Sequence, residues 1–254
     1  MRRQFSSGWI AFLIVIVFFL SWESIVRLWK VPTYLLPAPS QVLATLIAHP
    51  SLYFEASVIT FGEALLGLLC GVTVGALTAI LLTFWPRLEN GVMTLAILIK
   101  STPLVAIAPL LTLWLGFGWQ PKVVITALVT FFPVLINVLV GLQNIEPSLL
   151  ELFRSWRANR WELLFYLRLP HSLPYIFAAL KVSTPLALIG AVVAEWTGAS
   201  GGLGRTMWLA YTNLNLPYLF AAIFILATAG MGLYLLTARV EKHLVFWYTT
   251  THNV

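Results

Sequence analysis

The chain has 254 residues, of which 60% are hydrophobic and only 9% are charged, and its mean hydropathy is +0.91. A soluble domain carries about 25% charged residues, so this chain has too few polar side chains to cover a globule in water. It contains nine acidic residues, all glutamate, and a single cysteine, Cys70. These counts predict an integral membrane protein and exclude aspartate-dependent triads, aspartate-bridged metal pairs, internal disulfides and cysteine-based metal sites.

Six apolar stretches are each long enough to cross about 30 Å of hydrocarbon as a helix. In chain order they cover residues 8–28, 57–84, 92–115, 122–142, 175–194 and 218–238. The first follows Arg2 and Arg3 as the apolar part of a signal peptide does, but no small-residue cleavage site comes after Leu20. We interpret it as a retained helix, so the sequence predicts an all-α integral membrane fold with six transmembrane helices.

The distribution of lysine and arginine predicts the orientation of these spans, because cytoplasmic loops carry an excess of both. With a cytoplasmic N-terminus, the inner side holds Arg2, Arg3, Arg87, Arg154, Arg157, Arg160, Arg168, Arg239 and Lys242. The outer side holds only Arg27, Lys30, Lys122 and Arg205. We therefore expect a multi-pass protein of the bacterial plasma (inner) membrane with both termini in the cytoplasm.

Prolines and glycines mark special positions within the spans. We expect helix interruptions at Pro103, Pro109, Pro133 and Pro185. Along the second span, a spacing of four or five residues favours a close packing seam at Gly62, Gly67, Gly71 and Gly75. The outer segment 198–204 is rich in glycine but lacks the Lys-Ser/Thr of a phosphate-binding loop, so we predict a flexible extracytoplasmic turn.

Ionisable residues within spans are costly, about 2.5–3.5 kcal/mol for a central lysine, so each needs a reason. Lys100, shortly before Pro103, either lines a water-filled pathway or reaches back to the cytoplasmic surface, and the latter is the default for Lys181. Glu63 pairs with a cation or faces the pathway. We expect Glu195 near the outer surface, where it meets a partner or caps its helix. The candidate translocation-pathway residues are Glu63, Lys100, Pro103 and Lys181.

No pattern in the sequence predicts a cofactor or a metal ion. The histidines, which lie at loops and ends without metal-ligand spacing, are His49, His171, His243 and His252. No nucleotide-binding motif is present either. If the protein pumps a solute in one direction, another chain must supply the energy.

The longest connection lies on the inner side, between the fourth and fifth spans. About 30 residues from Gln143 to Pro174 are too many for a simple turn. A helix from Ser148 to Ala158 places on one face the apolar side chains Leu149, Leu150, Leu152, Phe153 and Trp156. Periodicity leaves two interpretations open: a helix lying flat on the membrane, or a helix that docks onto a cytoplasmic partner.

From Glu151 the same loop reads ELFRSWRANRWELLFYLRLPHSLPYIFAALK, which resembles the EAA loop of the permease subunits of ABC importers. The matching positions, in order and spacing, are Glu151, Ala158, Leu169, Pro170 and Pro174. The loop departs from the signature at Leu152 and Phe153, where the family usually has alanines, and at Arg157, where it has glycine. A glycine turn allows a closer backbone approach than arginine does.

Four other segments resemble one branch of that family, the permeases for nitrate, sulfonates, taurine, thiamine precursors and riboflavin. They are LLPAPSQV (35–42), KSTPLVAIAPLLTLWLGFG (100–118), FFPVLINVLVGL (131–142) and AEWTGASGGLG (194–204). The resemblance covers about residues 35–240. It implies a type I ABC importer permease fold, with an N-terminal helix and extracytoplasmic segment (1–54), a permease core (55–240) and a cytoplasmic tail (241–254).

The resemblance also implies partners and a coupling site. The implied partners are a dimer of cytoplasmic ATPases, an extracytoplasmic solute-binding protein and a second copy of the same permease, which would form a homodimer. The permease itself is then a non-catalytic subunit without a cofactor. Glu151 is implied as the polar contact to the ATPase, with apolar anchors beside it. The implied ATPase-coupling residues are Glu151, Leu152, Phe153, Trp156, Arg157 and Ala158.

The solute is less constrained than the class of protein. The sequence of segment 100–118 resembles the matching segment of permeases for nitrogen heterocycles, such as thiamine-precursor pyrimidines or riboflavin. The alternative solute is an anion of the nitrate, sulfonate or taurine type. The competing class is a self-sufficient ion-coupled carrier. Such a carrier is expected to place carboxylates deep in its spans, and only Glu63 is so placed.

Overall fold

The computed structural model describes residues 4–246, and within that range all regular structure is helical. The long helices are α1 (Gln4–Leu28), α3 (Pro50–Phe84), α6 (Gln120–Gln143), α9 (Leu169–Glu195) and α11 (Leu216–Leu244). The shorter ones are α2 (Pro39–Ala48), α4 (Glu89–Ser101), α5 (Leu104–Leu115), α7 (Pro147–Ser155), α8 (Arg160–Glu162) and α10 (Leu203–Thr212). A 3-10 turn, η1 (Pro86–Leu88), precedes α4, and a π-helical stretch, η2 (Leu163–Arg168), joins α8 to α9.

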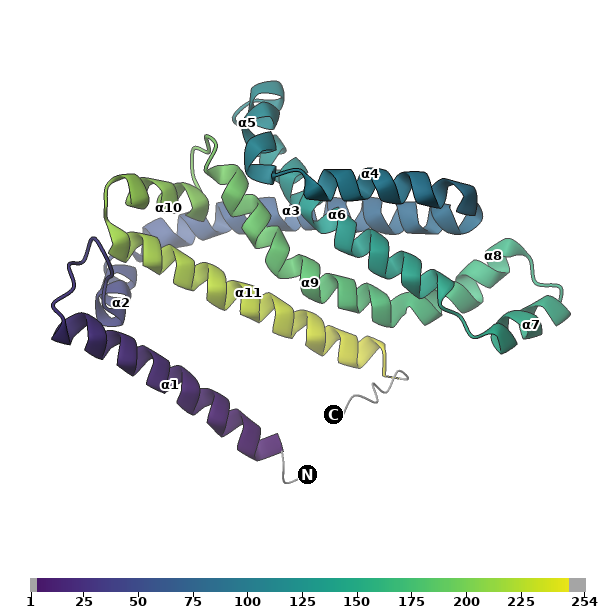
Figure 1. Ribbon diagram of the computed structural model, residues 1–254, viewed down its shortest axis with the longest axis horizontal. Helices are drawn as coiled ribbons and strands as arrows, with labels where there is room; N and C mark the ends of the chain where they lie inside the picture. The colour runs from purple at the N-terminus through teal and green to yellow at the C-terminus, as the bar shows by residue number, and fades with distance from the viewer. Residues whose placement is uncertain (1–3, 247–254) are drawn as a thin grey trace.

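The centre of the bundle is α6, with α3 and α9 packed against it and α11 beside α9 (Figure 1). Three of the four predicted seam glycines explain the close fit of α3 on α6. A Cβ at Gly71 would lie 2.7 Å from the Ala127 carbonyl oxygen, and one at Gly67 or Gly75 would also press on α6. Gly62 has open space around it, so the seam begins one turn later than predicted.

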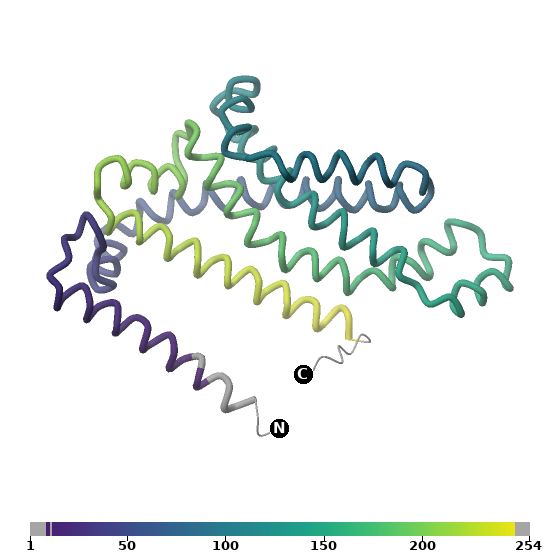
Figure 2. The backbone as a smooth tube through the Cα atoms, in the orientation of Figure 1, coloured from purple at the N-terminus to yellow at the C-terminus, as the bar shows by residue number. Residues whose placement is uncertain are grey.

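The α1 helix stands apart from the bundle toward its N-terminal end (Figure 2). Near its C-terminal end, Trp22 stacks on Phe224 of α11 with ring centroids 6.2 Å apart. Glu23 accepts hydrogen bonds from the backbone N–H and the hydroxyl of Ser40, at 3.0 and 2.7 Å, which hold α1 to the start of α2. The described side-chain contacts that hold α1 to α2 and α11 therefore lie in its C-terminal half.

Four helical segments within the described range are long and apolar enough to cross a membrane: α3, α6, residues 160–195 and α11. The pair formed by residues 86–101 and 104–115 makes a fifth if it is counted as one span. The α3 helix begins at Pro50, seven residues before the predicted start of the second span. The structure thus supports four or five spans, and six spans stay a prediction.

The predicted third span (92–115) is broken at Pro103, which confirms the interruption predicted there. Residues 86–101 and 104–115 meet at 94°, so α5 turns away from α4 (Figure 1). The cause is Pro103, which lacks a backbone N–H and forces the preceding residue out of the helical region. Thr102 accordingly has an extended ψ of 129°. The other three predicted interruptions, Pro109, Pro133 and Pro185, lie inside helices that continue past them.

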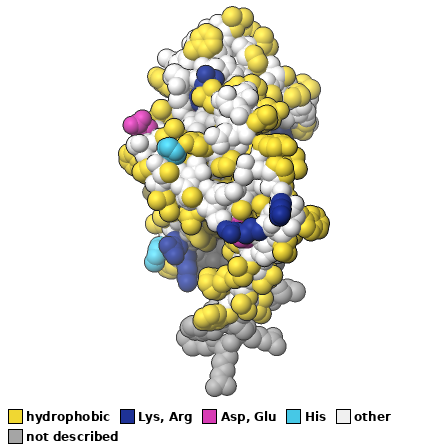
Figure 3. Space-filling view, turned by 90° about the vertical axis from the view of Figure 1, so that its left-hand side faces the viewer, with side chains coloured by type: hydrophobic (Ala, Val, Ile, Leu, Met, Phe, Trp, Pro, Cys, Tyr) yellow, Lys and Arg dark blue, Asp and Glu magenta, His cyan; other side chains and the backbone are white. Residues whose placement is uncertain are grey.

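The bundle has two ends of different character. At one end, here called the α7 end, lie η1, α7, α8 and the last turns of α11, while α2 and α10 lie at the opposite end, the α10 end (Figure 1). The described basic residues assigned to the inner side belong to these α7-end elements and to η2. Viewed directly, the α10 end shows scattered Lys and Arg side chains among many apolar ones (Figure 3).

Candidate functional site

The α7 helix ends in a tight, fully hydrogen-bonded turn. The Ala158 N–H bonds to the Phe153 carbonyl at 3.0 Å and the Arg157 N–H to the Arg154 carbonyl at 2.9 Å, which is the Schellman pattern. That pattern requires a left-handed residue, and Arg157 has φ +55°. The position where the EAA signature has glycine is therefore the position at which glycine is the least strained residue.

A second cap follows at once and starts α8. The Asn159 side-chain oxygen accepts the N–H groups of Trp161 at 2.9 Å and Glu162 at 2.8 Å, and the Glu162 carboxylate accepts the Asn159 N–H at 2.7 Å. This reciprocal capping box fixes the direction in which the chain leaves the turn. Together, α7, the turn and α8 form a hairpin with a defined shape, which we call the coupling hairpin (residues 147–162).

The coupling hairpin and the short segment that leads into it from α6 are attached to the bundle at two points. On one side, the Trp161 ring packs on Phe84 at the end of α3, with centroids 4.8 Å apart. On the other, the side-chain amide of Asn144 donates to the Tyr175 hydroxyl at 2.7 Å, and the Asn144 carbonyl lies 2.8 Å from His171 Nε2. The hairpin therefore contacts α3 directly, and the segment before it contacts α9.

The structure brings the six predicted coupling residues together on this hairpin. Glu151, Leu152, Trp156 and Arg157 are exposed, while Phe153 and Ala158 are half-buried. Trp156 is 68% exposed and its ring lies 5.7 Å from that of Phe153. Within the described residues, Glu151 has no ion pair or side-chain hydrogen bond. An acidic group beside an uncovered apolar face is a suitable contact surface for another protein.

Replacing Arg157 with glycine is expected to stabilise the hairpin by about 1 kcal/mol, because a non-glycine residue in the left-handed region costs about 1–2 kcal/mol. Hydrogen exchange of the α7 amides should slow correspondingly. Arg154→Gly is the matched control: it lies inside α7 and should instead destabilise the helix by about 1 kcal/mol. Equal shifts of the same sign in both variants would contradict the assignment of strain to Arg157.

The four predicted pathway residues do not converge on one site. Lys181 of α9 forms an ion pair with Glu241 of α11 at 2.8 Å, so its ammonium group is paired within the bundle. Lys100 is exposed at the end of α4, with its ammonium 4.4 Å from the centre of the Phe132 ring. Pro103 breaks the helix, and Glu63 lies in a separate cluster of buried polar groups.

That cluster is the feature the sequence did not reveal. Glu195, expected near the surface, is 0% exposed, and Lys122, expected on the outer side, is 1% exposed. Glu63 is 8% exposed and Thr60 is 0% exposed. We call these four residues the polar cluster; they come from α3, α6 and α9. A sequence signal existed, since three spans each carry one ionisable residue near the same end.

The end of the glycine-rich segment after α9 is hydrogen-bonded to the polar cluster. The Glu195 carboxylate accepts the backbone N–H of Gly204 at 2.5 Å and that of Arg205 at 3.3 Å. Thr60 donates its hydroxyl to Glu195 at 2.6 Å and accepts the Leu203 N–H at 2.7 Å. These bonds satisfy the first N–H groups of α10, as a carboxylate at a helix N-terminus does.

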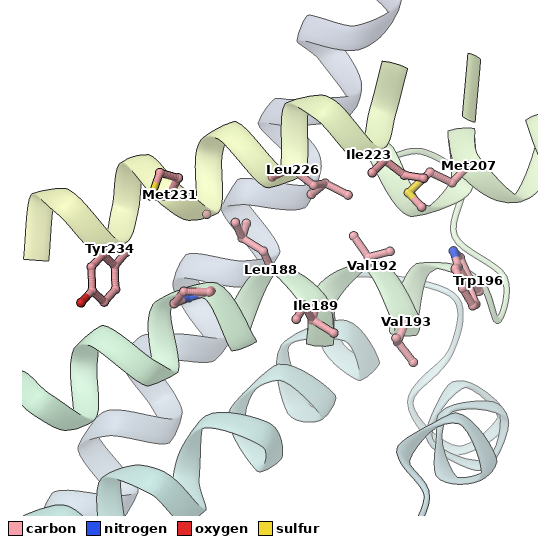
Figure 4. Close-up of a pocket in the computed structure, with 13 residues that line it drawn as sticks. Leu188, Ile189, Val192, Val193, Trp196, Met207, Ile223, Leu226, Met231 and Tyr234 are labelled. Atoms are coloured by element: carbon pink, nitrogen blue, oxygen red, sulfur yellow. The ribbon is translucent and has the colours of Figure 1, made fainter. Parts of the chain in front are cut away.

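An open apolar groove of about 680 Å³ runs between α9 and α11. Figure 4 shows Tyr234 at one end and Trp196 and Met207 at the other, with Leu188 and Val192 between them. Its lining contains no charged side chain. Within residues 4–246, no three His, Cys, Asp or Glu side chains are grouped so as to hold a metal ion.

Over residues 4–246, an all-helical bundle with four or five segments able to cross a membrane defines an integral membrane protein. The chain belongs to the family described as the inner membrane component of binding-protein-dependent transport systems, whose family model matches residues 71–246. It is therefore a permease subunit of an ABC importer, as the EAA-loop resemblance implied.

The relatives of this chain are named for the transport of different solutes. The chain is 35% identical to the formylaminopyrimidine transport permease protein ThiX of Halalkalibacterium halodurans, over 89% of this chain and 90% of the relative. It is 32% identical to the riboflavin transport system permease protein RibX of Chloroflexus aurantiacus (89% and 85%). It is 26% identical to the taurine transport system permease protein TauC of Escherichia coli (89% and 85%).

Among solved structures, the fold is similar to that of a chain of the MetNI methionine ABC transporter in an inward-facing conformation. The TM-score is 0.68 at 19% sequence identity, over 76% of this chain and 96% of the other. This similarity shows the fold of an ABC importer permease.

Proposed function

We propose that this permease works in an ATP-driven importer with a cytoplasmic ATPase dimer, an extracytoplasmic solute-binding protein and a second copy of itself. In this proposal the α7 end faces the cytoplasm, with both termini on that side of a bacterial inner membrane. The observation that carries it is the coupling hairpin, whose uncovered acidic and apolar residues suit a protein partner. The excess of basic residues at the same end supports the orientation.

In this mechanism the ATPase supplies the motion and the permease converts it. The ATPase grips Glu151 and the apolar side chains Leu152, Phe153 and Trp156, with Arg157 and Ala158 shaping the turn. Closure of the ATPase dimer moves the hairpin as a rigid body, because both of its caps are hydrogen-bonded. The anchors on Phe84 and Tyr175 then carry the motion to α3 and α9, which tilts the bundle between inward-facing and outward-facing states.

The solute we propose is a small nitrogen heterocycle, such as a thiamine-precursor pyrimidine or riboflavin. An anionic solute needs unpaired cations along its pathway. Lys181 is neutralised by Glu241, and Lys122 is buried within the polar cluster. Lys100 is the remaining lysine of the spans, and it supports the alternative of a nitrate-, sulfonate- or taurine-type anion. In that alternative, Pro103 lies beside Lys100 on the pathway and Glu63 lies farther along it. The chain's higher identity to ThiX and RibX than to TauC also favours the heterocycle.

Uptake into proteoliposomes tests this proposal. The permease, its ATPase and its binding protein are reconstituted, and labelled formylaminopyrimidine, riboflavin and taurine are supplied separately. We expect ATP-dependent uptake of a heterocycle and none of taurine. Taurine uptake would establish the anion alternative, and uptake by the permease without the ATPase would establish a self-sufficient carrier.

A further inference from the structure

A lysine side chain lies near the middle of the membrane-spanning bundle. The side-chain amide of Gln143, at the end of α6, donates to Glu89, at the start of α4, at 2.8 Å, so these two helix ends are level. From that level, Phe132 lies eleven residues back along α6 and Lys100 eleven residues forward along α4, which is about 17 Å in each case. The two side chains meet there, with the Lys100 ammonium 4.4 Å from the centre of the Phe132 ring.

This position decides between the two explanations open for Lys100. A lysine that reaches back to the cytoplasmic surface places its ammonium near the end of the neighbouring helix. This ammonium instead lies beside Phe132, at the midpoint of α6, which is also about 18 Å from Gln120 at the other end. Within residues 4–246, Lys100 forms no ion pair. An exposed, unpaired cation at this depth is too costly to face lipid, so it requires water.

The backbone next to Lys100 is also unsuited to lipid. The α4 helix ends at Ser101, and Thr102 and Pro103 are extended before α5 begins. All of these residues are exposed. Non-helical backbone occurs at membrane depth only where protein buries it or where it lines a water-filled cavity. The helix break and the unpaired lysine therefore form one surface that lipid does not cover, here called the Lys100 face (residues 100–103).

A second copy of the permease is the partner that covers the Lys100 face. In the single chain this face is open, although α4 and α5 pack on α6. In the homodimer of the proposed function, on which this step rests, a two-fold axis brings the same surface of each copy to its counterpart. Two lysine ammonium groups that face each other repel, so this face cannot pack dry. A water-filled gap between the copies follows.

We propose that the Lys100 face lines the solute path at the middle of the membrane, and that Lys100 is a solute-binding residue there. An ammonium has three hydrogen-bond donors and no acceptor. Lys100 therefore binds an oxygen acceptor of the solute and rejects cationic solutes. The carbonyl oxygen of a heterocycle and the sulfonate oxygen of an anion share this chemistry. Lys181 does not take this role, because Glu241 neutralises it.

Thiol labelling in membrane vesicles tests whether the Lys100 face is in water. In the full-length permease, the exposed Cys70 is first replaced by serine, and Lys100→Cys is compared with Val74→Cys. Val74 is the matched control: it is 54% exposed on α3, and its neighbour Gly75 packs on the middle turns of α6, so the depth is the same. A charged thiol reagent should label Lys100→Cys at least about tenfold faster, because only a thiolate reacts and lipid does not support one.

Equal rates in Lys100→Cys and Val74→Cys, whether fast or slow, overturn the proposal. Ser101→Cys keeps the lysine and should label as fast as Lys100→Cys. It keeps the proposal testable if Lys100→Cys does not insert, since slow labelling of Ser101→Cys also overturns it.

Chemical rescue tests Lys100 as a solute-binding residue in the reconstituted importer. Lys100→Cys should lower ATP-dependent uptake at least about tenfold, because it removes a charged donor from the solute. Aminoethyl methanethiosulfonate attaches an ammonium at position 100 and should restore most of the uptake. Methyl methanethiosulfonate attaches a neutral group, is the matched control, and should restore none. Undiminished uptake in Lys100→Cys, or equal effects of the two reagents, removes Lys100 from the solute site.

The solute that responds identifies the oxygen acceptor. Loss and rescue of riboflavin or formylaminopyrimidine uptake identifies a carbonyl oxygen. Loss and rescue of taurine uptake identifies a sulfonate, which corrects the proposed solute and supports the role of Lys100. Failure of the parent with all three solutes counts against the proposed function alone, because thiol labelling reports on the Lys100 face without any solute.

Discussion

Gly71→Leu is expected to separate α3 from α6 and to abolish the folded permease. A side chain at Gly71 would overlap the Thr130 hydroxyl and approach the Ala127 carbonyl oxygen, which is helix backbone and does not rotate away. Overpacking of a close core costs about 1–3 kcal/mol for added methylenes, and here four carbons enter a contact that lacks room for one. We expect the yield of monodisperse protein in detergent to fall to background.

Gly62→Leu is the matched control for this effect. Gly62 lies on the same helix, two and a half turns earlier, and no atom lies within 4 Å of its Cβ position. The variant should purify like the parent with an unchanged melting temperature, since leucine favours a helix over glycine by about 1 kcal/mol. If both variants are lost, or both survive, close approach at the seam does not hold α3 to α6.

The helices that the sequence predicted well are those whose local signal is unambiguous. The α6, α9 and α11 helices coincide with predicted spans to within a few residues at most ends, because an unbroken apolar run in a membrane has no alternative to helix. Hydropathy alone gives the third span as one apolar run, whereas the break at Pro103, which the proline itself predicted, depends on a missing backbone donor.

The coupling hairpin and the polar cluster differ in how much of each could be predicted from the sequence. The coupling hairpin is a local structure, so its helix and its amphipathic face followed from neighbouring residues, while the interest of position 157 came from the resemblance to the EAA loop. The polar cluster joins residues far apart in the chain, such as Thr60, Lys122 and Glu195. Lys122 and Glu195 looked like residues at span ends when judged alone, Thr60 gave no signal, and only the packing of α3, α6 and α9 makes them one unit.

This packing places the two regions at opposite ends of the same helices. The coupling hairpin contacts Phe84 at the end of α3, and Asn144, just before the hairpin, bonds to Tyr175 near the start of α9. A hydrogen bond of 2.6 Å between Thr60 and Glu195 joins α3 and α9 again toward their other ends. A force applied at the α7 end therefore acts on a frame that is fastened at both ends, which is what a rigid-body switch between two states requires.

Glu151→Lys is expected to uncouple the permease from its ATPase and to lower ATP-dependent uptake by at least about tenfold. Residues central to an interface cost about 2 kcal/mol or more when altered, and a reversed charge adds repulsion to the lost contact. Glu151 is exposed and has no ion pair among the described residues, so the permease itself should fold unchanged. Co-purification of the ATPase with tagged permease measures the association directly.

Glu55→Lys is the control that makes this result specific. It reverses the charge of an exposed glutamate near the start of α3, at the α10 end. The hairpin contacts the opposite end of α3, at Phe84. Because only the end that meets the ATPase should matter, ATPase association should persist in Glu55→Lys and fail in Glu151→Lys, while both variants keep the parent's melting temperature. Unchanged association in Glu151→Lys would remove Glu151 from the docking surface, and loss in both would point to net charge as the cause.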